Sequence, residues 1–290
     1  MQIFIDSAKL EEIKEAYDAG ILDGVTTNPS LIKKAADEIK KRGESLDMKS
    51  YIKKILLAAQ KARVSLEVTE YTCEKMVEQG RLLFKMFNPV AKNVYIKIPA
   101  NPSFTELPFM EARRRKRMKF SYEEGQKTRD FDGLKAIKKL SQEKIPINCT
   151  LIFTPEQALM AAKAGAKIVS PFAGRIDDYL RTLNNVPFEK SDYFPAEGKE
   201  GWHDNGIVSG IDLVRKIVEI FRKHNVKSEV LAASMRNARQ VREAALAGAD
   251  ISTLPFEVIL ELLQHYKTRE GMRSFTDDAI PEYVDLTKRI

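Results

Sequence analysis

The sequence predicts an α/β protein folded as a (β/α)8 barrel. Short apolar runs alternate with longer helical segments along the chain, and eight such pairs can be counted. Parallel strands need helical crossovers, so this alternation favours a parallel sheet over hairpins, and eight units suggest closure into a barrel. The 290 residues, 43% of them hydrophobic, are enough for one barrel domain spanning residues 1–290.

The predicted strands are short runs rich in β-branched and aromatic residues and bounded by turn signals. In chain order they occupy residues 3–5, 24–26, 64–68, 94–99, 147–152, 168–170, 228–232 and 250–252. The helices that follow them are predicted at residues 10–19, 29–42 with a second from about 47, 73–87, 131–142, 155–164, 176–183, 237–247 and from 255 onward.

Prolines and glycines mark the predicted helix boundaries. Pro29, Pro155 and Pro255 each follow a strand by a few residues, where a first helical turn tolerates a missing N–H. Gly165 and Gly248 end helices and turn the chain into the next strand.

Three segments of the chain are not needed for a minimal (β/α)8 barrel. Residues 101–129 and 184–206 are rich in charge, proline or glycine and are predicted as insertions at the functional end of the barrel. A helical extension, about residues 268–290, either covers the barrel or clasps a neighbouring subunit, and a homo-oligomer is expected. Tyr193, Phe194, Trp202 and His203 of the second insertion form either a lid or a docking surface, although an aromatic loop more often serves packing.

The net charge of +7 and pI near 9.1 favour an anionic partner, either a nucleic acid or a phosphorylated metabolite. The basic run at residues 113–119 suits phosphates but is more often a solvated face, so nucleic-acid binding is the less favoured choice. Two cysteines and three scattered histidines offer neither a disulfide framework nor a metal cluster. The start of the chain lacks a signal sequence and no long apolar window occurs, so a cytoplasmic location without membrane partners is expected.

One lysine, Lys97, stands inside the apolar run at residues 94–99. Burial disfavours the ammonium form, and a neutral buried amine is a good nucleophile toward carbonyl carbon. Alternatively, Lys97 points its tip out of the strand end or only pairs with a carboxylate.

Polar residues stand at one predicted strand end after another. Catalytic groups of such barrels gather at the C-terminal ends of the strands, so these residues predict a site around the barrel centre. They are Asp6, Thr27, Asn28, Glu67, Lys97, Asn148, Thr150, Ser170, Ser234 and Arg236.

Several stretches resemble the transaldolase family, which includes the fructose-6-phosphate aldolases, from Met1 to about Pro255. "GVTTNPS" followed at suitable distances by "SPFAGRI" and "AASMRN" is a specific combination, whereas "KIP" alone would be weak. The matching stretches are residues 5–6, 23–30, 66–68, 96–99, 148–153, 170–176 and 232–237.

The resemblance implies Schiff-base chemistry on sugar phosphates without a metal or organic cofactor. Lys97 would form an imine with the keto group of a ketose phosphate, and Asp6 would be the acid/base at the hydroxyl that loses its proton during cleavage. Glu67 would act with a water held by Thr150.

The resemblance also implies a set of substrate-binding residues. Hydroxyl and amide groups would hold the dihydroxyacetone part, and the two guanidinium groups with one hydroxyl would bind the phosphate. Asn28 and Ser170 are the residues for the first part, and Arg175, Ser234 and Arg236 those for the second. Thr27, Asn148 and Phe172 are further expected substrate-binding residues.

Each of these roles has a structural rival. Asp6 can cap a helix, Glu67 can simply neutralise Lys97, and the segment of Thr27 and Asn28 can merely shape a turn. Arg175 can pair with Asp177 or Asp178, Arg236 can cover the following helix, and Thr150 and Ser170 can be ordinary interior hydroxyls.

Two positions bear on the choice between transfer and release of the three-carbon unit. In the resembling family, transaldolases show glutamate and phenylalanine where this chain has Glu67 and Phe172, while fructose-6-phosphate aldolases show glutamine and tyrosine. Both residues favour a transaldolase, with the aldolase as the alternative. A non-enzymatic nucleic-acid-binding barrel that relies on residues 112–119 is the third hypothesis.

Overall fold

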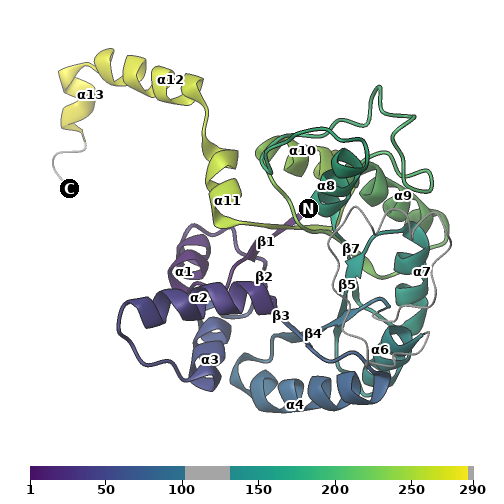
Figure 1. Ribbon diagram of the computed structural model, residues 1–290. Coiled ribbons are helices and arrows are strands. Elements are labelled where there is room, and N and C mark those ends of the chain that lie inside the picture. Colours follow the sequence, from purple (N-terminus) through teal and green to yellow (C-terminus); the bar gives the residue numbers. More distant parts are fainter. Residues whose placement is uncertain (102–130, 287–290) are drawn as a thin grey trace.

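The computed structural model describes residues 1–101 and 131–286, so the first predicted insertion lies outside the described residues except for Asn101. Eight parallel strands close into a barrel in the order of the sequence, which confirms the predicted (β/α)8 fold (Figure 1). The strands are β1 Gln2–Asp6, β2 Gly24–Thr26, β3 Arg63–Glu67, β4 Val94–Pro99, β5 Ile147–Ile152, β6 Ile168–Pro171, β7 Glu229–Ala232 and β8 Ile251–Leu254.

Helices surround the barrel, and buried aliphatic residues fill the layer between them and the strands (Figure 1). In order the helices are α1 Leu10–Asp18, α2 Pro29–Lys41, α3 Met48–Ala58, α4 Cys73–Ala91, α6 Asp132–Gln142, α7 Pro155–Ala164, α8 Ala173–Leu183, α9 Gly210–Lys223, α10 Ala238–Leu246, α11 Phe256–Leu263, α12 Tyr266–Asp277 and α13 Pro281–Asp285. Within residues 1–101 and 131–286, no helix combines the length and the apolar character needed to cross a membrane.

The predicted boundaries hold to within a few residues. Pro29 and Pro155 occupy the first turns of α2 and α7, while Pro255 stands one position earlier, as the N-cap of α11. Gly165 ends α7 with φ +108°, a conformation that glycine adopts without strain. The main shifts are that α4 ends four residues beyond the predicted residue 87, that α8 begins three residues before the predicted start at residue 176, and that β8 continues two residues beyond 252.

The base of the barrel, where the strands begin, is closed by an aromatic ring and an ion pair. A Cβ added to Gly24 would stand 2.4 Å from the Phe4 ring, so this glycine makes room for the ring. Arg63 lies 5.0 Å from the centre of the same ring and 5.7 Å from that of Tyr95, and its Nη2 donates to Glu229 Oε1 at 3.2 Å. These residues stabilise the end of the barrel opposite to the strand C-termini.

Strand β5 contains a bulge. Between the pairs Cys149–Val169 and Ile152–Pro171, β5 has two residues where β6 has one. Leu151, one of the two, has φ +56°, which is unusual for a residue other than glycine. The bulge shifts the alternation of side chains at the C-terminal end of β5, where the neighbouring residue is Thr150.

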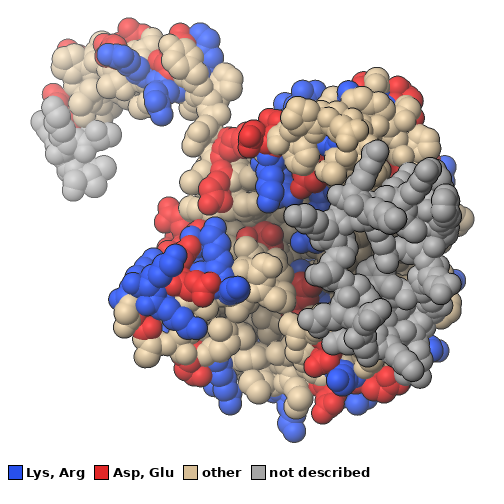
Figure 2. Space-filling view, viewed as in Figure 1, with Lys and Arg blue, Asp and Glu red and all other residues tan. Residues whose placement is uncertain are grey.

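The C-terminal extension stands away from the barrel (Figure 1). Helix α11 packs through Val258 and Ile259, but α12 and α13 contain no buried residue. The extension therefore does not cover its own barrel, which was one of the two alternatives predicted. Figure 2 shows positive and negative side chains interspersed over α2 and over the extension.

Candidate functional site

A cavity of about 760 Å³ opens at the C-terminal ends of the strands. Its walls come from the strand ends, from α8 and from the second insertion. The residues that line it are Asp6, Thr26, Asn28, Lys97, Phe153, Ser170, Phe172, Arg175, Ile176, Asp178, Tyr179, Thr182, Lys190, Asp204, Leu231, Ala233, Ser234, Met235, Arg236, Thr253 and Pro255.

Lys97 is buried beneath the cavity, with 4% of its surface exposed. Glu67 is its neighbour in register on β3, and the distance from Lys97 Nζ to Glu67 Oε2 is 3.0 Å. Nζ also donates to the carbonyl oxygen of Thr27 at 3.2 Å. The amine therefore has a carboxylate within proton-transfer distance and does not point out of the barrel.

Asp6 faces the same cavity from the end of β1, and two threonines fix its carboxylate. Thr26 Oγ1 donates to Asp6 Oδ1 at 2.7 Å and lies 2.6 Å from Thr253 Oγ1. Burial raises the pKa of Asp6 above its ordinary value of 3.8, although Lys97 and the hydrogen bond from Thr26 oppose the rise. Asp6 caps no helix, since the N-cap of α1 is Lys9.

Ser170 on β6 is oriented by a chain of hydrogen bonds behind it. Its hydroxyl donates to Asn148 Oδ1 at 2.6 Å, and Asn148 Nδ2 donates to Ser65 Oγ at 3.1 Å. Asn148 is fully buried and is not among the residues that line the cavity. It therefore acts on Ser170 rather than facing the cavity itself.

Thr150 is buried at the bulge of β5. Its Oγ1 has no hydrogen-bond partner within residues 1–101 and 131–286. A buried hydroxyl without a partner is costly, and a bound water is the usual solution. Thr150 pairs in register with Pro99, two residues beyond Lys97.

Thr27 and Asn28, the two residues that follow β2, have different roles in the structure. Asn28 lines the cavity, and its Oδ1 accepts from Leu31 N at 3.0 Å, so one side chain both caps α2 and leaves its NH2 group for other partners. Thr27 donates to the carbonyl oxygen of Ser65 at 2.8 Å and is not among the lining residues. The hydroxyl that faces the cavity from β2 is that of Thr26.

Two arginines stand at the α8 side of the cavity. Arg175 lies over the Phe172 ring at 5.0 Å, and Arg236 Nη2 donates to Asp178 Oδ2 at 3.0 Å. The aspartate partner predicted for Arg175 thus belongs to Arg236. Ser234 has φ +62°, a strained conformation of the kind that often occurs at functional sites.

The second insertion reaches the cavity through Lys190 and Asp204. The four predicted lid residues, Tyr193, Phe194, Trp202 and His203, are not among the lining residues. Two of these rings pack on arginines of the barrel helices: Arg239 lies 4.1 Å from the Tyr193 ring and Arg181 lies 5.0 Å from the Phe194 ring. These aromatic residues anchor the loop by packing.

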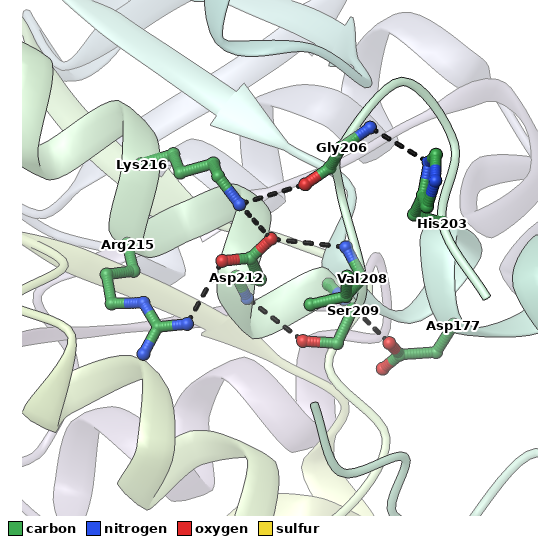
Figure 3. A network of polar contacts seen from close by, with 9 residues as sticks. Asp177, His203, Gly206, Val208, Ser209, Asp212, Arg215 and Lys216 are labelled. Carbon is green, nitrogen blue, oxygen red and sulfur yellow. Dashed lines mark hydrogen bonds and ion pairs between the residues drawn. The ribbon is translucent and has the colours of Figure 1, made fainter. Parts of the chain in front are cut away.

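A polar network fixes the end of this insertion to α9 (Figure 3). Buried Asp212 accepts hydrogen bonds from Val208 N at 3.1 Å, from Arg215 Nη2 at 3.0 Å and from Lys216 Nζ. Ser209 caps the helix by accepting from Asp212 N at 3.0 Å. The loop that carries Lys190 is therefore held at its C-terminal end.

The structure brings most of the predicted site residues together. Eight of them line the cavity: Asp6, Asn28, Lys97, Ser170, Phe172, Arg175, Ser234 and Arg236. The other four, Thr27, Glu67, Asn148 and Thr150, lie outside the lining. Five further lining residues, Thr26, Phe153, Asp178, Lys190 and Thr253, were not predicted as site residues from the sequence.

The fold and the site define a class: a (β/α)8 barrel whose polar centre surrounds one buried lysine. The profile of the family described as transaldolase/fructose-6-phosphate aldolase matches residues 3–289. A probable transaldolase of Chlorobium phaeobacteroides is 39% identical over 279 residues, which cover 96% of this chain and 97% of that protein. Probable transaldolases of Clostridium perfringens and Thermoplasma volcanium are each 37% identical over 278 residues, covering 96% of this chain and 97% and 95% of theirs. The chain belongs to the transaldolase/fructose-6-phosphate aldolase family of enzymes.

Solved structures match more distantly. A mandelate oxidase aligns with a TM-score of 0.45 and 14% identity over 88% of this chain, and the alignment spans 64% of that longer chain. A thiamine phosphate pyrophosphorylase from Pyrococcus furiosus aligns with a TM-score of 0.44 and 14% identity, over 88% of this chain and 85% of that one.

Proposed function

We propose that this chain is a transaldolase that moves a dihydroxyacetone unit from a ketose phosphate to an aldose phosphate through an imine on Lys97. The observation that carries the proposal is the buried Lys97 amine, 3.0 Å from Glu67, in a cavity that Asp6 also lines. Fructose 6-phosphate or sedoheptulose 7-phosphate would be the donor.

Imine formation needs an amine free of its extra proton and a route for the departing water. Glu67 is close enough to take a proton from Lys97 Nζ and to return it to the carbinolamine hydroxyl, which leaves as water. A water held at the unpaired hydroxyl of Thr150 would relay these protons.

Cleavage needs a base on the other side of the cavity. Asp6 would remove the proton from the C4 hydroxyl, so that the C3–C4 bond breaks and its electrons move into the imine to give an enamine. The aldose phosphate leaves, and the enamine attacks the aldehyde carbon of the acceptor, which takes the proton back from Asp6. The raised pKa of Asp6 brings this group closer to the pH at which it must both accept and donate.

The substrate would lie between two groups of residues. Asn28 and Ser170 are placed for the hydroxyls of the three-carbon unit, with Asn148 holding Ser170 and Phe172 forming an apolar wall. Arg175, Ser234 and Arg236 stand together along α8 and the segment after β7, where they suit a phosphate group.

A direct test uses sodium borohydride with fructose 6-phosphate, followed by peptide mass mapping. Reduction should leave the sugar or its three-carbon fragment on Lys97, and Lys97→Met should show no adduct while retaining its circular dichroism spectrum. A Lys163→Met variant controls for the same change on an exposed helix. Labelling at another side chain would contradict the proposal.

The alternative is a fructose-6-phosphate aldolase that releases free dihydroxyacetone. Glu67 and Phe172 favour transfer, because a phenyl ring offers no hydroxyl to protonate or hydrate the enzyme-bound three-carbon unit. With fructose 6-phosphate and erythrose 4-phosphate the enzyme should form sedoheptulose 7-phosphate and glyceraldehyde 3-phosphate. Rapid release of dihydroxyacetone without an acceptor would favour the aldolase.

We also propose that the chain self-associates through its C-terminal extension. Monomeric proteins rarely leave large contiguous apolar surfaces in water, and an arm that reaches beyond its own barrel is placed to pack on a second copy. The exposed apolar residues of the extension and of the α11 segment that leads into it are Leu260, Leu262, Leu263, Tyr266, Met272, Phe275, Ile280, Tyr283, Val284 and Leu286.

A further inference from the structure

The Arg236 side chain packs against two residues of α8, Gly174 and Asp178. A Cβ added to Gly174 would stand 2.7 Å from Arg236 Nε and 3.0 Å from Arg236 Cγ, so the arginine crosses the helix at this glycine. One turn further along α8, Asp178 Oδ2 accepts from Arg236 Nη2 at 3.0 Å. Residues four apart share a helix face, so the glycine supplies room and the aspartate supplies an anchor.

In the pair of Asp178 and Arg236, each charged group keeps one polar atom that makes no hydrogen bond within the described residues. Asp178 Oδ1 and Arg236 Nε are both buried without a hydrogen-bond partner in the described part of the chain. Both side chains also line the cavity and remain about a quarter exposed, at 25% and 24%. A carboxylate thus stands beside a guanidinium that is placed to receive an anion.

The backbone around Arg236 is held from other directions as well. Arg236 N donates to Gln240 Oε1 at 2.8 Å, and a Cβ on Gly174 would stand 2.0 Å from the carbonyl oxygen of Ser234. With the backbone fixed in this way, the hydrogen bond to Asp178 orients the guanidinium within the described part of the chain.

We propose that Asp178 sets the phosphate affinity of the site, by orienting Arg236 and by cancelling part of its positive charge. This inference rests on the proposed function, in which one aldose phosphate must leave and another must bind at the same arginines in every cycle. A carboxylate near the bound phosphate weakens binding, because two negative charges repel one another. Asp178 is therefore a positioning and affinity-determining residue and takes no part in the imine chemistry.

Asp178→Asn separates the two roles, because the amide oxygen still accepts a hydrogen bond from Arg236 Nη2 while the negative charge is lost. Inorganic phosphate should inhibit this variant about three- to tenfold more tightly than the wild-type enzyme. The KM of fructose 6-phosphate should fall by a similar factor without a rise in kcat. Turnover of the unphosphorylated pair fructose and erythrose, which lacks the phosphate that Arg236 would bind, should stay unchanged.

Asp178→Ala removes the anchor together with the charge, so its phosphate affinity should be lower than that of Asp178→Asn. Asp37→Asn, the same change on an exposed position of α2, is the matched control and should leave all constants unchanged. The increase in melting temperature with added phosphate gives a second measure of affinity that needs no turnover.

Unchanged phosphate affinity in Asp178→Asn would overturn the inference, and so would an equal change with unphosphorylated substrates, which would indicate a structural role. Both outcomes would leave the proposed function intact if the wild-type enzyme forms the Lys97 adduct. A wild-type enzyme that phosphate neither inhibits nor stabilises would instead overturn the phosphate site itself and this inference with it.

Discussion

At the scale of single residues, the cavity depends on side chains whose neighbours set their protonation and direction. Asp6 is an example, because its carboxylate accepts from Thr26, which in turn contacts Thr253. Neither threonine is part of the proposed chemistry, yet both determine the state of the proposed base.

Thr26→Val should therefore change the pH dependence of the reaction. Loss of the hydrogen bond from Thr26 removes an influence that lowers the pKa of Asp6, so that pKa should rise further. Asp6 must be ionised to take the hydroxyl proton, and the acidic limb of the kcat profile should move to higher pH, with kcat reduced about tenfold near neutrality. Thr26→Ser keeps a hydroxyl and should restore most of the wild-type profile. An unshifted limb in Thr26→Val would remove Thr26 from this role.

The residues that the sequence could and could not identify differ for a physical reason. Lys97, Glu67 and Asp6 stand out because charged groups interrupt or end apolar runs. Thr26 and Thr253 gave no such signal, because both are uncharged and the sequence does not show which of two adjacent residues at a strand end faces the cavity. The β8 run was expected to end at residue 252, which left Thr253 out. Arg236 and Asp178 are 58 residues apart in the sequence, and their spacing does not reveal that they form a hydrogen bond.

At the scale of elements, β1 and β2 show how closely the barrel is packed. Gly24→Ala would place a methyl group 2.4 Å from the Phe4 ring inside a closed ring of strands. We expect the variant to lose about 1–3 kcal/mol in free energy of unfolding, measured by urea titration. Gly201→Ala, where an added Cβ meets nothing within 4 Å, is the control and should change stability little. Equal stability of Gly24→Ala and the wild-type protein would contradict the packing described here.

The order of the strands could be predicted because the alternation of apolar runs and amphipathic segments is regular, and all eight strands were located. Helix α9, which follows the second insertion, was not among the predicted helices. The C-terminal extension was also recognised as helical. Its direction could not be predicted, since an amphipathic pattern indicates that a face becomes buried but does not identify the surface that buries it.

At the scale of the whole molecule, that apolar arm predicts an effect on assembly. Phe275→Asp should shift the protein toward smaller species in analytical ultracentrifugation, because a charge on the contact surface must be desolvated when copies associate. Ser274→Asp adds the same charge at the adjacent position of α12, and we expect it to affect assembly less. A wild-type protein that sediments as a monomer would exclude the proposed self-association.

Global stability should also depend on pH through Asp177. This carboxyl group joins three helices, since Asp177 on α8 accepts from Gly210 N and from Gln240 Nε2, each at 2.7 Å. Burial raises its pKa from 3.8 to about 7. Because the folded state then holds a proton that the unfolded state has lost, the contribution of Asp177 is greatest below about pH 4 and is lost as the pH rises to about 7.

Asp177→Asn should flatten this dependence, because an amide cannot ionise. Its oxygen can still accept from Gly210 N, while the contact with Gln240 Nε2 is lost. Melting temperatures measured between pH 4 and 8 should fall less with rising pH in the variant than in the wild-type protein. If melting temperature falls equally with pH in the variant and in the wild-type protein, Asp177 does not titrate between pH 4 and 8.

The bulge of β5 limits how this barrel can change in length. Leu151 occupies a left-handed backbone conformation in the middle of a parallel sheet, and that geometry exists because β5 carries one residue more than β6 at this point. Removing one residue there would let the ladder run evenly, with Ile152 still beside Pro171, but it would change the direction in which the Thr150 side chain points. We therefore expect a one-residue deletion at the bulge to disturb the position of Thr150 while the pairing of β5 with β6 beyond it is kept.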